Sequence, residues 1–82
     1  MKFILSESGN KVINLAFIKD FAIERVVYQD GGSTESHVIA ELEDDSDVTI
    51  KIFDSGNEEE NFYAARIYLA ELVDKLNGGA KL

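Results

Sequence analysis

Apolar and polar residues alternate along three segments of the chain, in the period-two pattern of half-buried β-strands. The segments cover about residues 18–28, 36–42 and 48–53. The side chains expected on the buried face of the last two are Val38, Ala40, Leu42, Val48, Ile50 and Ile52. Asp30-Gly31-Gly32 separates the first two segments and Asp44-Asp45-Ser46-Asp47 the last two, and both are typical turn sequences. The pattern therefore predicts an antiparallel meander with one buried face.

Two shorter apolar runs precede the meander. Residues 3–5 are expected to form a first strand, followed by a turn at Gly9-Asn10. Val12 and Ile13 open a second short strand, which Asn14 interrupts. Because asparagine is a favourable N-cap, we expect a single helical turn over residues 15–17.

The end of the chain has a helical period instead. Apolar residues recur there at spacings of three and four, at Phe62, Ala65, Leu69, Leu72, Val73 and Leu76. Ser55 stands three residues before Glu58, as in a capping box, and Asn77-Gly78-Gly79 is a typical helix exit. A helix over residues 55–77 would be about 33 Å long and would cover the apolar face of the meander.

The predicted fold is therefore α+β, with a four- to five-stranded antiparallel meander covered by one C-terminal amphipathic helix. The pattern leaves open whether the sheet is flat or a half barrel like that of pleckstrin-homology domains. The 82 residues fit a single domain over residues 1–82 and leave no room for two.

A second apolar group lies on the predicted helix, beside the core-facing stripe. Tyr63, Ile67 and Ala70 follow one another at i, i+4 and i+7, and Tyr68 adds a ring on the flank. Isolated surface apolar residues are normal on any protein, so this group is either ordinary surface or an interface. A core this small often needs a disulfide, a metal or a partner chain, which favours a twofold homodimer.

Composition removes several classes of function. The net charge of −8 opposes binding to nucleic-acid phosphates and to anionic membrane lipids, so we expect neither as a direct partner. The chain has no cysteine, which excludes disulfides and thiolate metal sites. No stretch approaches the roughly 18 apolar residues of a membrane span, and we expect a cytoplasmic protein.

Candidate chemistry is sparse. The acidic run of Glu41, Glu43, Asp44, Asp45 and Asp47 lacks the glycine and the spacing of a calcium loop, so we interpret it as a solvated turn. His37 with a nearby acid would make a general acid–base pair, but its strand position suggests an exposed histidine. Gly31-Gly32-Ser33 lacks the lysine of a phosphate-binding loop. We therefore expect no catalytic residue, no cofactor and no metal.

The order of these segments resembles that of small uncharacterised proteins of Gram-positive bacteria and their mobile elements. The resemblance lies in residues 13–18, 48–55 and 72–77, together with the long strand between the first two. It implies a strand meander with one closing helix. It carries no catalytic motif, so it transfers no functional residue.

The leading hypothesis is a non-enzymatic interaction module, homodimeric, that binds a protein partner through Tyr63, Ile67, Tyr68 and Ala70. An alternative is an acidic protein that imitates nucleic-acid charge and blocks a DNA-binding protein, because acidic residues gather at residues 41–47 and 58–60. A third is a ligand-binding domain or small enzyme with its site at a dimer seam.

Overall fold

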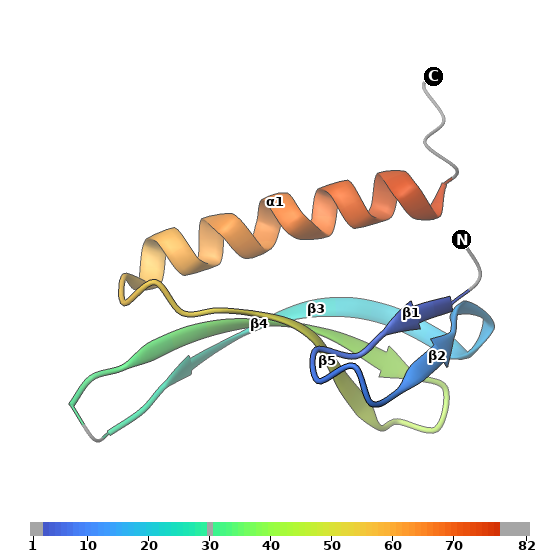
Figure 1. The fold of residues 1–82 in the computed structure, drawn as a ribbon, viewed down its shortest axis with the longest axis horizontal. Coiled ribbons are helices and arrows are strands. Elements are labelled where there is room, and N and C mark those ends of the chain that lie inside the picture. Colours follow the sequence, from blue (N-terminus) through green and yellow to red (C-terminus); the bar gives the residue numbers. More distant parts are fainter. Residues whose placement is uncertain (1–2, 30, 78–82) are drawn as a thin grey trace.

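A computed structural model describes residues 3–29 and 31–77 (Figure 1). In chain order its elements are β1 (Phe3–Leu5), β2 (Val12–Asn14), the 3-10 turn η1 (Leu15–Phe17), β3 (Ile18–Val27), β4 (Thr34–Leu42), β5 (Asp47–Phe53) and α1 (Glu58–Leu76). The α+β fold with a C-terminal helix is confirmed. The strands form two antiparallel sheets, β1-β2 and β3-β4-β5. The predicted helix exit at Gly78-Gly79 lies outside the described residues.

The hairpin of β1 and β2 leads directly into η1. Asn14 caps this turn as expected, because its Oδ1 accepts a hydrogen bond from the Ala16 N–H at 2.9 Å. Between the two strands, the Glu7 N–H donates to the Thr49 carbonyl of β5 at 2.8 Å. The hairpin is thereby anchored to the outer side of β5.

Helix α1 lies across one face of the three-stranded sheet (Figure 1). The β1-β2 hairpin contributes to the same core near the C-terminal end of the helix. The buried cluster comprises Ile4, Ile13, Ala40, Val48, Ile50 and Leu72. Fully burying a valine, leucine or isoleucine side chain contributes roughly 1.5–3 kcal/mol, so this cluster of strand and helix residues is a major source of stability.

A β-bulge in β5 changes which side chains of that strand face the helix, so the predicted position of Ile52 is wrong. Val38 is opposite Lys51 and Ile39 is opposite Thr49, so Ile50 is an extra residue between the two pairs. An extra residue shifts the alternation of side chains by one position. Ile52 therefore shares the face of its partner His37, away from α1, while Val48 and Ile50 stay in the core.

The start of α1 also differs from the prediction. The cap is Asn57, whose Oδ1 accepts a hydrogen bond from the Glu60 N–H at 3.0 Å. The proposed capping box of Ser55 and Glu58 is wrong, because the N-cap is two residues after Ser55, with Gly56 between them at a left-handed φ of 91°. Val73, expected in the core, is 43% exposed, since it lies one helical step of about 100° beyond the buried Leu72.

One polar side chain is enclosed where α1 meets the sheet. Asn61 is 1% exposed, and its Nδ2 donates to the Thr34 carbonyl at 3.1 Å. Its Oδ1 accepts from the Ser55 N–H at 2.6 Å. Asn61 thus joins the first turn of α1, the first residue of β4 and the loop that enters the helix.

We expect Asn61→Ala to lower the free energy of unfolding by about 2–4 kcal/mol, because it leaves the buried Thr34 carbonyl and the part-buried Ser55 N–H without a partner. Asn57→Ala, which removes a partly solvated cap nearby, should cost only about 1 kcal/mol. Urea denaturation of both variants measures the difference. Equal losses in the two variants would contradict the bridging role of Asn61.

Candidate functional site

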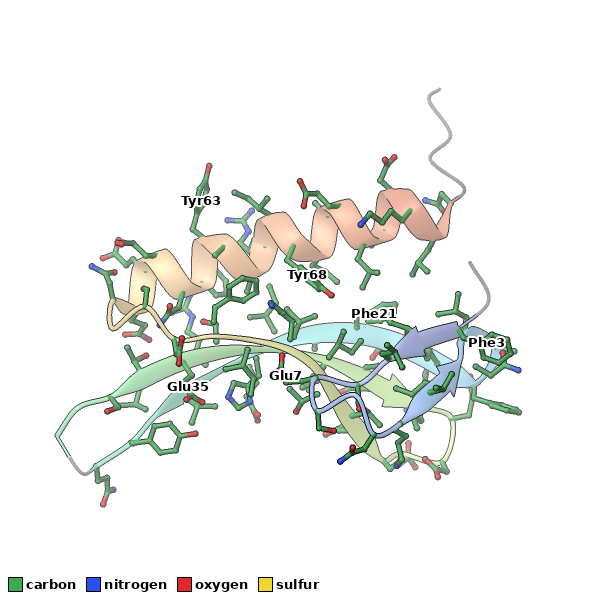
Figure 2. All side chains as sticks on the ribbon, viewed as in Figure 1. Phe3, Glu7, Phe21, Glu35, Tyr63 and Tyr68 are labelled. Carbon is green, nitrogen blue, oxygen red and sulfur yellow. The ribbon has the colours of Figure 1, made fainter. Side chains whose placement is uncertain are left out.

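The four residues predicted as an interface do not form one patch. Tyr63 and Ile67 lie on the side of α1 that faces away from the sheet, and they are 65% and 43% exposed. Figure 2 shows Tyr63 projecting outward and Tyr68 directed toward the sheet. Tyr68 is half-buried against the core, with its ring 5.9 Å from that of Phe53 in an edge-to-face contact. Ala70 is exposed and lines the rim of a groove.

This groove runs between α1 and β3. It has a volume of about 500 Å³ and mostly apolar walls, formed by Phe21, Ala22, Ile23, Phe62, Arg66, Leu69 and Ala70. Phe21 lies between the helix and the sheet (Figure 2). The groove therefore exposes the β3 side of the core at residues 21–23.

Beside the groove, β3 forms an edge of its sheet. β4 pairs with one side of β3, and within residues 3–29 and 31–77 no strand pairs with the other side. The Tyr28 N–H donates to the Ser33 carbonyl, which places the residues of β3 that bond to β4 at even positions. Because bonded and non-bonded pairs alternate in an antiparallel ladder, Phe21, Ile23 and Arg25 direct their backbone groups to the open edge.

Charged side chains close the end of the groove near the start of α1. The Arg25 guanidinium lies 3.9 Å from the centre of the Phe62 ring, in cation–π geometry. Its Nη1 is also 3.8 Å from the Glu58 carboxylate. Both partners are about half exposed, so this ion pair orients Arg25 more than it stabilises the fold.

The opposite face of the sheet carries a polar network. The Glu35 carboxylate accepts hydrogen bonds from the Tyr28 hydroxyl at 2.9 Å and from His37 Nε2 at 2.7 Å. The bond from His37, and after it the bond from Tyr28, lowers the pKa of Glu35. The expectation of an exposed His37 is wrong, because this network leaves its side chain only 16% exposed. The network locks two neighbouring strands together on the face away from α1.

An acidic row crosses the same face. Asp20, Glu41 and Asp47 are directly opposite one another on β3, β4 and β5. Hydrogen bonding with Asp20, and then the charges of Asp20 and Asp47, raise the pKa of Glu41. Like charges at opposite positions destabilise a sheet, so this row costs folding free energy at neutral pH.

The acidic run continues into the turn between β4 and β5. Asp44 accepts hydrogen bonds from the Ser46 N–H at 3.0 Å and from its hydroxyl at 2.6 Å, and these bonds lower the pKa of Asp44. The Lys19 ammonium lies 2.9 Å from Asp45. Asp44 and Asp45 therefore stabilise the turn. The described part of the chain contains no group of three or more ligands able to hold a metal ion.

The chain has no match among protein-family models, curated proteins or solved structures. The resemblance to small proteins of Gram-positive bacteria therefore stays an expectation. Among the residues that the structure describes, no helix combines the length and the apolar character needed to cross a membrane. Any functional conclusion therefore rests on the geometry of the surfaces described above.

The sequence prediction missed the edge of β3 and its groove. The available signal was topological, because the first strand of a meander has only one sequential neighbour and is an edge unless another element covers it. The side chains of Phe21 and Ile23 lie on the face of β3 that is turned toward α1. They line the open groove because α1 contacts β4 more extensively than β3.

We expect Glu35→Gln and Glu41→Gln to change stability in opposite directions. Glu35 has a lowered pKa, so its contribution is present above its ordinary value of 4.5 and is lost as the pH falls through the lowered value. Glu41 has a raised pKa, so it destabilises the protein at neutral pH, and this penalty disappears as the pH falls.

Glu35→Gln should therefore be less stable than the wild type at about pH 6, and Glu41→Gln more stable, with both differences shrinking toward about pH 3. Urea titrations at several pH values measure both effects. Parallel pH profiles for the wild type and either variant would contradict the assignment of that residue.

Proposed function

We propose that the protein is a non-enzymatic interaction module of the cytoplasm that forms a homodimer and binds a protein partner. The observation that supports this most directly is the open edge of β3 beside an apolar groove. Together these features present hydrogen-bonding backbone groups and apolar side chains on one surface. Addition of a strand to an exposed sheet edge is a recurring mode of protein recognition.

The edge carries two of the features that hinder such pairing, the bulge at Lys19 and the inward charge of Arg25, which lies against the Phe62 ring. Natural edge strands carry prolines, inward charges or bulges that hinder contact with another chain. The chain has no proline, and the one bulge in the pairing of β3 with β4 lies at Lys19, near the start of the strand. From Asp20 to Val26 the strand is regular.

The outward face of α1 offers a second surface for a different partner. Tyr63 and Ile67 are the large apolar side chains there, and aromatic residues are enriched in protein interfaces. They lie on the far side of the helix from the sheet. A partner protein bound to this face would leave the edge of β3 accessible.

Sedimentation equilibrium tests the dimer. The wild-type protein should sediment at twice the 9.1 kDa mass of the chain at high micromolar concentration. Dissociation to the chain mass should follow on dilution, because an interface of modest size binds in the micromolar range. A protein that sediments as the monomer at every concentration contradicts the homodimer.

A second candidate function is the acidic imitation of nucleic acid, favoured by the row of Asp20, Glu41 and Asp47 on one open face. The two functions differ in their response to salt. An apolar contact with Tyr63 and Ile67 persists in about 1 M salt, whereas a contact made by carboxylates weakens steeply because salt screens exposed charges.

Affinity capture from the native cell at about 0.15 M and 1 M salt separates the two. For a partner on α1, we expect retention at both concentrations and a loss of at least tenfold with Ile67→Glu, about the effect of 1.4 kcal/mol. Val73→Glu is the matched control, since Val73 is equally exposed at 43% but lies on another side of the helix. Loss of the partner in high salt, with weaker capture by Glu41→Gln, would instead support the acidic imitation.

A further inference from the structure

We propose that the second copy of this chain binds edge to edge at β3, antiparallel, with the twofold axis at Ile23. This inference rests on the homodimer proposed above and specifies its geometry. The two sheets would join into one sheet of six strands, in the order β5-β4-β3 followed by β3-β4-β5 of the second copy. Three features of β3 specify this geometry: the backbone groups at its open edge, the charges along the strand and the position of its bulge.

The direction of the backbone groups restricts the possible registers. The odd-numbered residues of β3, among them Phe21, Ile23 and Arg25, point their N–H and C=O groups to the open edge. Two such edges can exchange hydrogen bonds only where an odd residue is opposite another odd residue. The twofold axis must then pass through a residue of β3, and opposite residues share a face of the joined sheet.

This condition also places the two helices. Phe21 and Ile23 face the groove under α1 in each copy, so both helices lie on the same side of the joined sheet. The two grooves then meet above the junction of the strands. Apolar side chains that are half-buried in one chain become the floor of a shared core.

The twofold axis can pass through any of the five central residues, 21 to 25, and like charges exclude three of these registers. An axis at Glu24 or at Arg25 sets that residue against itself. An axis at Ala22 sets Asp20 against Glu24 of the second copy and Lys19 against Arg25. Like charges directly opposite are destabilising in an antiparallel pair.

The position of the bulge favours one of the two registers that remain, those with the axis at Phe21 or at Ile23. An axis at Phe21 places Lys19 opposite Ile23, so the irregular backbone at Lys19 falls inside the paired segment of both copies. An axis at Ile23 pairs the regular segment from Asp20 to Val26 with itself. In this register Phe21 is opposite Arg25, an aromatic ring against a cation that already stacks on Phe62.

Single cysteines test the register, because the wild-type chain has none. In the proposed dimer Ile23 is opposite itself, with about 5.5 Å between Cα atoms, which is within disulfide range. Phe21 is four positions from its copy, about 13 Å away, and cannot be bridged without backbone movement. Under mild oxidation, Ile23→Cys should form covalent dimers at least about tenfold faster than Phe21→Cys or Ile67→Cys.

The outcomes distinguish this inference from the proposed function. A sedimenting dimer that crosslinks fastest at Ile23→Cys supports both. A dimer that crosslinks fastest at Phe21→Cys or Ile67→Cys overturns the Ile23 register and keeps the homodimer. A wild-type monomer overturns both. Far-UV circular dichroism of each variant verifies that the substitutions have not unfolded the chain.

Amide hydrogen exchange of the wild-type protein provides a measurement without substitutions. The amides of Phe21, Ile23 and Arg25 should gain at least about tenfold protection between dilute and concentrated samples, because pairing of β3 covers them. The amides of Ala22 and Glu24 bond to β4 in either state and should gain less. Exchange of the odd amides that does not depend on concentration would overturn the proposal.

Discussion

The amide of Asn61 is the contact on which the arrangement of helix and sheet depends. It bonds at once to the carbonyl of Thr34 and to the N–H of Ser55, and it has almost no contact with solvent. Apolar contacts alone would hold α1 against the sheet in many positions, since they have little directional preference. The two hydrogen bonds of the buried Asn61 amide define one position, because a shift of the helix leaves this amide and the Thr34 carbonyl unpaired. The groove beside β3 exists because the helix is held over β4.

The rest of the described chain contacts one edge of the three-stranded sheet, at β5, and leaves the other edge, at β3, without a neighbouring strand. The β1-β2 hairpin contacts β5 through the Glu7 N–H and adds Ile4 and Ile13 to the core. β3 has the helix beside it but no strand along its outer side in the described part of the chain. The N-terminal hairpin therefore completes one side of a small core, and the other side keeps half-buried apolar residues. This asymmetry places the proposed self-association at the edge of β3.

Much of the fold was predictable from the sequence, because it depends on local patterns. Alternation identified β3, β4 and β5, and the capping role of Asn14 was correct. The errors arose where one residue changed a local rule. The helix begins after Asn57 and not at Ser55, with the left-handed Gly56 between the two, and the extra residue at Ile50 turns Ile52 to the other face. The surface was less predictable. The direction of Tyr68 depends on Phe53, which belongs to another element, and alternation places His37 and Glu35 on one face without showing that they share a hydrogen bond.

The bulge at Ile50 has a consequence for the composition of the core. Strict alternation would place Val48, Ile50 and Ile52 on the helix-facing side of β5. With the extra residue at Ile50, Val48 and Ile50 stay in the buried cluster, Ile52 turns to the other face, and Phe53 contacts Tyr68 on the helix in its place. The bulge thus exchanges an aliphatic side chain for an aromatic ring at the end of the strand. In a chain of 82 residues, this brings a large ring against the helix without requiring a longer sheet.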